Sequence, residues 1–168
     1  AEISTRKAIQ INPNFAEAYN NLGNILKDLD QLEEAEISTR KAIQINPNFA
    51  EAHNNLGTIL AHFGNSDGAL FSTKIAIKLN PNFAEAYYNL GKILKDFDNI
   101  KEAKISIKKA IKLKPNYGLA HYTLSQIYSL ENHYNKAYKE IKLAIKSNPK
   151  NHVFKGELNR IKFIVEKA

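Results

Sequence analysis

Cysteine, methionine and tryptophan are absent from the 168 residues. Without cysteine the chain has no disulfide, no thiolate metal ligand and no cysteine nucleophile. No apolar run approaches the roughly eighteen residues that a membrane-spanning helix needs, and the N-terminus lacks the basic and then apolar layout of a signal peptide. The sequence therefore predicts a soluble protein without membrane contact, for which a cytoplasmic location is favoured. Because no initiator methionine is present, we expect the chain to be a segment of a larger protein.

Groups that could support catalysis are also scarce. No two histidines are three or four residues apart, none lies in a cluster of carboxylates, and no glycine-rich phosphate loop follows a predicted strand. The sequence therefore predicts no enzymatic activity, no metal and no cofactor. The histidines are His53, His62, His121, His133 and His152.

The five prolines, by contrast, recur at one fixed interval, which defines a 34-residue period. A Leu-Gly pair recurs three times with the same period, and so do several alanines. Such regularity indicates an array of similar structural units rather than one irregular domain. The prolines are Pro13, Pro47, Pro81, Pro115 and Pro149, and the Leu-Gly pairs lie at 22–23, 56–57 and 90–91.

Within each period the apolar residues recur every three or four positions, which predicts two amphipathic helices per unit. Each proline should end the preceding helix. Three asparagines, Asn14, Asn48 and Asn82, precede a glutamate by three residues, and this spacing predicts a capping box at the start of each first helix. The turn within each helix pair carries a residue that tolerates a left-handed backbone, namely Asp30, Gly64, Asp98 and Asn132.

This pattern resembles the tetratricopeptide repeat (TPR) family, whose 34-residue unit combines an aromatic residue, Leu-Gly, alanines and a terminal proline. The resemblance implies an all-α fold, a right-handed superhelical solenoid of antiparallel helix pairs with about ten helices. The glycines of the Leu-Gly pairs would lie where the two helices of a pair approach closely, and His53 and His121 would fill aromatic core positions. The predicted segments are 1–15, the second helix of a truncated repeat; 16–49, 50–83, 84–117 and 118–151, four repeats; and 152–168, a C-terminal capping helix.

In the family that the chain resembles, the first helices line a concave groove that binds peptide segments, so the resemblance implies a protein or peptide partner. The asparagine row Asn21, Asn55 and Asn89 is expected to face solvent there and to pair with a peptide backbone, because a carboxamide both donates and accepts. This row and the NNLGNIL segment are similar to the superhelical repeats of O-linked N-acetylglucosamine transferase. The candidate groove residues are Asn20, Asn21, Asn24, Lys27, Asn54, Asn55, Tyr88, Asn89, Lys92, Lys95, Tyr122, Thr123 and Gln126.

Two other functions stay open at this point. The net charge of +7 lies in the second half of the chain, where lysines crowd the second helices, and such a surface could bind nucleic acid or another acidic surface. The scarcity of arginine argues against nucleic acid, because phosphate and base recognition favour its planar fork. The chain could also be a targeting module of an attached transferase.

The first eighteen residues recur without change as residues 35–52. Residues 1–13 therefore match a second helix that has no first helix before it. Since the end of a solenoid exposes core surface, we expect weak self-association through this N-terminal helix.

Overall fold

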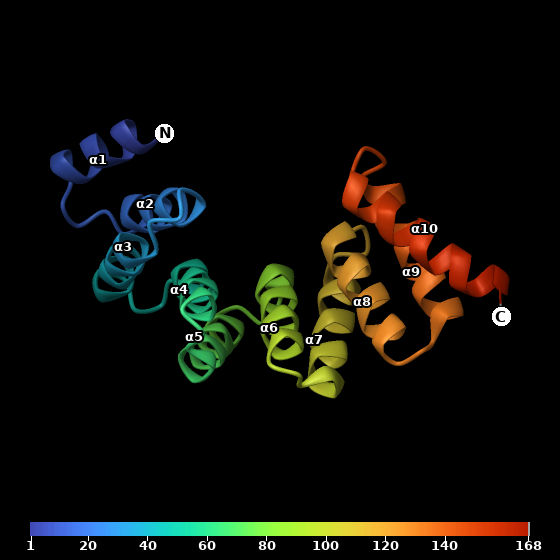
Figure 1. The fold of residues 1–168 in the computed structure, drawn as a ribbon. Helices are drawn as coiled ribbons and strands as arrows, with labels where there is room; N and C mark the ends of the chain where they lie inside the picture. The colour runs from blue at the N-terminus through green and yellow to red at the C-terminus, as the bar shows by residue number, and fades with distance from the viewer. Residues whose placement is uncertain (168) are drawn as a thin grey trace. The chain divides into compact units, whose positions relative to one another are not determined.

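A computed structural model describes residues 1–167, which form ten α-helices and no strand (Figure 1). The all-α class and the number of helices are therefore as predicted. The helices are α1 (Glu2–Ile11), α2 (Ala16–Asp28), α3 (Leu32–Ile45), α4 (Ala50–His62), α5 (Ser66–Leu79), α6 (Ala84–Asp96), α7 (Ile100–Leu113), α8 (Gly118–Leu130), α9 (Tyr134–Ser147) and α10 (His152–Lys167).

The helices divide into two kinds by their place in the 34-residue period. The first helices of the repeats are α2, α4, α6 and α8, and the second helices are α1, α3, α5, α7 and α9. The chain also folds into two compact units: an N-terminal unit, Ala1–Asn89, and a C-terminal unit that begins at Leu90, within α6. In both units a first helix packs against the second helix that follows it, as in the pairs α2 with α3 and α8 with α9.

The ends of the helices follow from proline and from the turn residues. Asn12, which precedes Pro13, has an extended backbone (φ −131°), as the ring of a following proline requires, and α1 ends one residue before it. Inside the helix pairs, Asp30, Asp98 and Asn132 have φ between 58° and 63°, and Gly64 has a φ of 72°. These positive values confirm the predicted left-handed turns.

The predicted capping boxes are wrong. The residues that precede α2 and α4 are Phe15 and Phe49, and neither helix has a side-chain cap. The asparagine before each proline accounts for the difference: Asn12 Oδ1 accepts a hydrogen bond of 3.1 Å from the backbone N–H of Asn14, and Asn46 does the same for Asn48. Because these side-chain turns hold Asn14 and Asn48 outside the helix, the helix begins two residues later.

Close contact within each helix pair depends on glycine. A Cβ atom added to Gly57 would overlap Oγ1 of Thr73 and lie 3.1 Å from the carbonyl oxygen of Ala69. Gly23 faces Thr39 and Ala35 in the same way, and Gly91 faces Ile107, whose Cγ1 would be 2.6 Å from the added atom, and Ala103. The close approach predicted at the Leu-Gly pairs is confirmed, because any larger residue would separate the two backbones.

The identical segments in α1 and α3 show what a neighbouring helix contributes. Helix α3 contacts both α2 and α4, and its Thr39 and Ala42 are completely buried. Helix α1 contacts α2, and the matching residues Thr5 and Ala8 are only half-buried. The isoleucine Ile11 is 86% exposed. This exposed flank is the surface on which weak self-association was predicted, and self-association itself stays a prediction.

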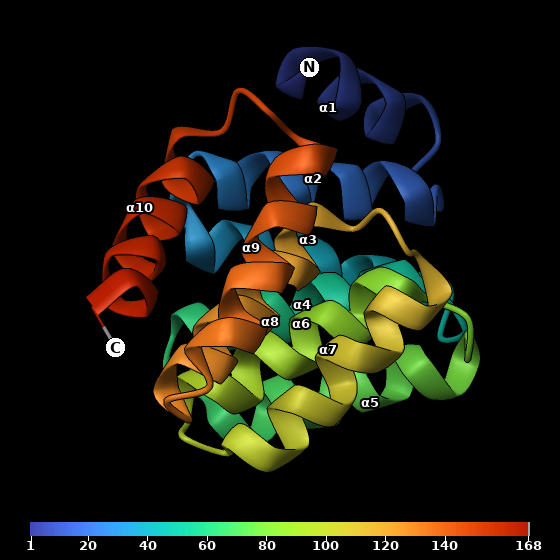
Figure 2. The ribbon, with the colours of Figure 1, turned by 90° about the vertical axis from the view of Figure 1, so that its right-hand side faces the viewer.

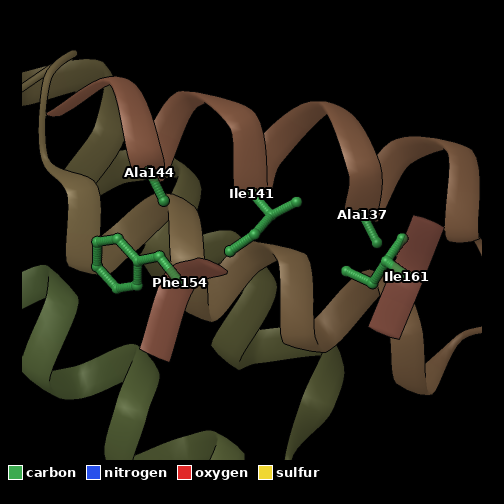
Figure 3. Packing of buried hydrophobic residues seen from close by; sticks show 5 residues of the cluster. All are labelled: Ala137, Ile141, Ala144, Phe154 and Ile161. Atoms are coloured by element: carbon green, nitrogen blue, oxygen red, sulfur yellow. The ribbon is translucent and has the colours of Figure 1, made fainter. Parts of the chain in front are cut away.

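At the other end of the chain, α10 packs alongside α9 (Figure 2). An apolar stripe of α10 faces α9: Phe154 and Ile161 are buried, and Leu158 and Val165 pack against the same cluster. Figure 3 shows Phe154 and Ile161 beneath the small and branched side chains of α9, which are Ala137, Ile141 and Ala144. By its place in the 34-residue period, α10 occupies the position of a further first helix.

The same substitution at two glycines should have opposite effects on stability. Gly57→Ala should lower the free energy of unfolding by about 1 to 3 kcal/mol, because the new methyl group overpacks the contact with α5. Gly156 lies in α10 with no atom within 4 Å of an added Cβ. Gly156→Ala should therefore raise the free energy of unfolding by about 0.5 to 1 kcal/mol, since alanine restricts the unfolded chain.

Urea denaturation monitored by circular dichroism measures both changes. Equal effects of the two substitutions would contradict this account of the helix contact.

Candidate functional site

The candidate residues of the N-terminal unit lie on three first helices. They are Asn20, Asn21, Asn24 and Lys27 on α2, Asn54 and Asn55 on α4, and Tyr88 and Asn89 on α6. Those of the C-terminal unit are Lys92 and Lys95 on α6, and Tyr122, Thr123 and Gln126 on α8.

Two pairs of asparagines link successive first helices in the N-terminal unit. Asn55 Nδ2 donates a hydrogen bond of 2.7 Å to Oδ1 of Asn20, and Asn89 Nδ2 donates one of 3.0 Å to Oδ1 of Asn54. The acceptors Asn20 and Asn54 are buried, with only 6% and 5% of their surface exposed. Because buried carboxamides need partners, each asparagine pair stabilises the stacking of one repeat on the next.

The expectation that Asn21, Asn55 and Asn89 all face solvent is therefore wrong for two of them. Asn55 and Asn89 are half-buried and hydrogen-bonded, while Asn21 is exposed. The difference arises because the hydrogen-bond partner of each such asparagine lies on the first helix of the preceding repeat. No first helix precedes α2 in this sequence, so Asn21 has no corresponding partner. Asn24 is half-buried, and the ammonium group of Lys27 lies 3.9 Å from the Asp28 carboxylate.

In the C-terminal unit the structure brings two candidates together. Lys95 and Gln126 line a hollow of about 280 Å³ with residues of α8 and α10. Gln126 Nε2 donates a hydrogen bond of 3.0 Å to the hydroxyl of Tyr122. Lys92 is exposed and Thr123 is buried, and neither lines the hollow. The other lining residues are Ser129, Leu130, Glu157 and Arg160.

Glu157 and Arg160 are site residues that the sequence analysis missed. The guanidinium of Arg160 donates two hydrogen bonds to the Glu157 carboxylate, of 2.7 and 2.9 Å. The period could have identified both, since Glu157 lies one full period after Thr123 and Arg160 lies one full period after Gln126. Helix α10 was predicted only as a capping helix. Its place in the period shows that it also extends the row of first helices.

Tyr122 forms the aromatic side of this region. Its ring centroid lies 5.1 Å from that of Phe154. Burial raises the pKa of the Tyr122 hydroxyl, and the nearby negative charge of Glu157 raises it further. The hydroxyl therefore stays protonated at neutral pH and can both donate and accept a hydrogen bond.

The hollow offers binding groups rather than a catalytic arrangement. It presents an ammonium group, a carboxamide and an ion-paired guanidinium, and Oγ of Ser129 is buried without a hydrogen-bond partner within residues 1–167. In that same part of the chain no three His, Asp or Glu side chains are grouped as metal ligands. None of the ten helices combines the length and apolar character that would let it cross a membrane.

Two further hollows lie beside second helices of the N-terminal unit and are related by the period. One of about 380 Å³ is lined by Ile9, Leu22 and Ile37, and one of about 420 Å³ by the matching residues Ile43, Leu56 and Phe71. Both are largely apolar. The first hollow lies between the second helices α1 and α3, over the first helix α2. The second lies between α3 and α5, over α4.

The two core histidines occupy matching positions but have different neighbours. Nε2 of His53 lies 2.9 Å from the carbonyl oxygen of Pro47, and Nε2 of His121 lies 2.9 Å from that of Pro115. Both rings are buried, as predicted. Only His121 also meets a carboxylate, since its Nδ1 lies 2.7 Å from Glu140.

Because both nitrogens of His121 face acceptors, the doubly protonated ring can donate to each of them. The hydrogen bond to Glu140 raises the pKa of His121 above its usual value, although burial opposes this shift. The position that matches Glu140 in the repeat of His53 is Ser72.

The Asn20–Asn55 pair can be tested by a change at Asn55. Asn55→Ala should lower the free energy of unfolding by about 1 to 3 kcal/mol, because it leaves the buried carbonyl of Asn20 without a partner. Asn21→Ala, at the matching position one repeat earlier, removes an exposed side chain and should change stability by less than about 0.5 kcal/mol. Urea denaturation of both variants makes the comparison, and equal losses would show that the hydrogen bond is not the cause.

The His121–Glu140 pair predicts a pH-dependent stability. The pKa of His121 is raised in the folded state above an unfolded value of about 6.5, so the contribution of the pair is fully present below that pH. It is lost as the pH rises through the folded-state pKa, and the free energy of unfolding should fall by about 1.5 to 3 kcal/mol, the range for a hydrogen bond to a charged group.

Urea denaturation at a series of pH values measures this fall. In the Glu140→Gln variant the slope of stability against pH between about 6 and 8 should be much smaller. A variant with the same slope as the unchanged chain would mean that other groups titrate.

Comparison with known proteins identifies the repeat. Sequence models of the tetratricopeptide repeat match residues 16–49, 39–71, 84–117 and 119–151, which together make up more than half of the chain. No curated protein sequence matches it.

Solved structures are similar over nearly the whole chain. The crystal structure of MamA is 26% identical, covers 87% of this chain and 85% of its own, and has a TM-score of 0.72. A thermophilic TPR protein of Thermus thermophilus is 18% identical with a TM-score of 0.84, covering 95% of this chain and 87% of its own. The pilF structure of Pseudomonas aeruginosa is 22% identical with a TM-score of 0.83, covering 98% of this chain and 75% of its own.

The period, the helix pairs, the glycine contacts and these similarities agree on one fold, an all-α solenoid. The chain therefore belongs to the tetratricopeptide repeat family, whose fold is that of a protein–protein interaction scaffold.

Proposed function

We propose that the first helices of this scaffold bind extended peptide segments of a partner protein, without catalysis. The observation that carries the proposal is the polar hollow of the C-terminal unit. Three successive helices in first-helix position, α6, α8 and α10, contribute Lys95, Gln126 and Arg160 to it. A ligand that lies across several repeats would meet one such side chain from each helix.

The chemistry of the hollow favours a peptide with an acidic side chain. Among the lining residues, Lys95 and Arg160 carry two positive charges and Glu157 one negative charge; the exposed carboxylate of Asp96 also lies 3.3 Å from the ammonium group of Lys95. The carboxamide of Gln126 can donate to a peptide carbonyl or accept from a peptide N–H without regard to the side chains of the ligand. The ring of Tyr122 adds apolar area beside these polar groups.

In the N-terminal unit the asparagine pairs have an indirect role in this proposal. Asn55 donates to Asn20, and Asn89 donates to Asn54. These two hydrogen bonds hold neighbouring first helices in register. The groups left for a ligand on α2 are then the exposed Asn21 and the half-buried Asn24. Binding there should be weaker than in the hollow, since the basic candidate on α2, Lys27, already lies 3.9 Å from the Asp28 carboxylate.

Display selection of peptides against the whole chain provides the ligand for a test. Gln126→Ala should weaken binding of a selected peptide by about 0.5 to 1.5 kcal/mol, as the loss of one hydrogen bond does. Lys95→Ala should weaken it most at low salt, because Lys95 is half-buried and salt still screens the contribution of a partly exposed charge. The measurement is isothermal titration calorimetry at two salt concentrations.

Lys74→Ala on the exposed side of α5 serves as the control and should leave the affinity unchanged. If Gln126→Ala and Lys95→Ala both bind as tightly as the unchanged chain while their circular dichroism is normal, the first helices are not the binding surface.

A further inference from the structure

A cluster of lysines surrounds one aromatic ring on the second-helix side of the C-terminal unit. The ammonium nitrogens of Lys104 and Lys108, on α7, lie 5.9 and 5.8 Å from the ring centroid of Tyr128, on α8. That of Lys136, on α9, lies 5.7 Å from the same centroid. Because all three nitrogens contact one ring, three positive charges share a small area. We name Lys104, Lys108, Lys136 and Tyr128 the Tyr128 cluster.

The positive charge of the Tyr128 cluster is only partly balanced. Lys104 donates a hydrogen bond to Glu131, and this contact lowers the pKa of the Glu131 carboxyl. Within residues 1–167, neither Lys108 nor Lys136 forms an ion pair with a carboxylate. The cation–π contacts with the tyrosine hold the three ammonium groups close together but do not neutralise them.

The other repeats show that the fold does not need this charge. Three repeats earlier, the positions of the three lysines are occupied by Glu2, Arg6 and Glu34. The guanidinium of Arg6 bonds to both glutamates there, at 2.8 and 3.4 Å. Two repeats earlier the matching residues are Glu36, Arg40 and Gly68, with Arg40 bonded to Glu36 at 2.7 Å.

One repeat earlier the matching residues are Leu70, Lys74 and Glu102. The residue that matches Tyr128 is leucine in all three preceding repeats: Leu26, Leu60 and Leu94. Three lysines and the tyrosine thus occur together only where the last two repeats meet, although the matching helices of the earlier repeats fold with other residues at each of these places.

We propose that the Tyr128 cluster binds an acidic segment of a partner protein. Three ammonium groups within a small area suit paired carboxylates, since each lysine is a compact donor that can reorient toward an oxygen. Exposed lysines continue the surface on both helices, with Lys101 and Lys112 on α7 and Lys139 on α9. The lysines of this surface all lie on second helices, and the proposal does not depend on the function proposed for the first helices.

Nucleic acid fits the Tyr128 cluster less well. Single strands are bound by stacking bases on open aromatic rings, but three ammonium groups already lie around the Tyr128 ring. Neither α7 nor α9 contains an arginine, the residue that pairs bidentately with phosphate.

The test uses a fluorescein-labelled oligoglutamate peptide and fluorescence anisotropy with the whole chain at low salt. Lys136→Glu places in the cluster the residue already present at Glu34 and Glu102, so the fold should tolerate it. It should weaken peptide binding at least about tenfold. Tyr128→Leu, which restores the leucine of the other repeats, should weaken binding several-fold because the ammonium groups lose their common anchor.

Two controls separate a site from general attraction. Lys155→Glu, on the exposed side of α10, changes the net charge by the same amount and should leave the affinity within about twofold of the unchanged chain. Lys136→Arg keeps the charge and should retain binding. Circular dichroism and urea denaturation verify that each variant is folded.

The proposal is wrong if the unchanged chain does not bind oligoglutamate, or if Lys155→Glu weakens binding as much as Lys136→Glu does. It is also overturned if an oligothymidylate of equal charge binds more tightly than the peptide and loses its affinity in Lys136→Glu, because the surface would then serve nucleic acid.

Discussion

The close approach of two helices at a glycine is the contact on which the rest of this structure depends. At Gly57 the backbone of α4 meets a threonine side chain and an alanine carbonyl of α5 with no space for a methyl group. Small residues such as Ala69, Ala76 and Ala103 are completely buried around these contacts. Since the interior is filled by backbone and small side chains, each helix pair is thin, and its outer surfaces are free to vary without changing the fold.

Burial in such a fold is decided by the neighbouring repeat more than by local sequence. The segment in α1 and α3 is the same, yet Thr39 is buried whereas Thr5 is only half-buried. The asparagines follow the same principle, because Asn55 bonds to Asn20 while Asn21, at the matching place, is exposed. Residues that contact each other between repeats therefore lie about one period apart in the sequence. The first repeat in the chain lacks the contacts that a preceding repeat would provide.

The sequence predicted the helices well because their signals are local and repeated along the chain. Proline at one interval, left-handed residues such as Asp30 and glycine in the Leu-Gly pairs each act within a few residues of the backbone. The capping boxes were predicted wrongly because two local signals compete, and the side-chain turn at Asn12 takes precedence over capping by Asn14.

The candidate site was less predictable, for a geometric reason. Its contacts join residues about one repeat apart, such as Asn55 with Asn20, and periodicity alone does not say whether matched side chains meet each other or solvent. Arg160 was not predicted, because the sequence analysis assigned its helix as a capping helix and not as a further first helix. Lys95 and Gln126 were found because both lie in the row that the first helices share.

The repeats also provide an internal comparison that separates folding from function. Residues that pack a helix pair hardly change along the chain: Ala35, Ala69, Ala103 and Ala137 match, and each is completely buried. Charged positions on the second helices do change, from the Glu2–Arg6 ion pair in the first unit to the lysines around Tyr128 in the second. A change that leaves the interior intact while it concentrates like charges costs electrostatic repulsion and gains nothing in packing. Glu131 balances only one of the three lysines, and the acidic partner segment that we propose would supply the remaining negative charge.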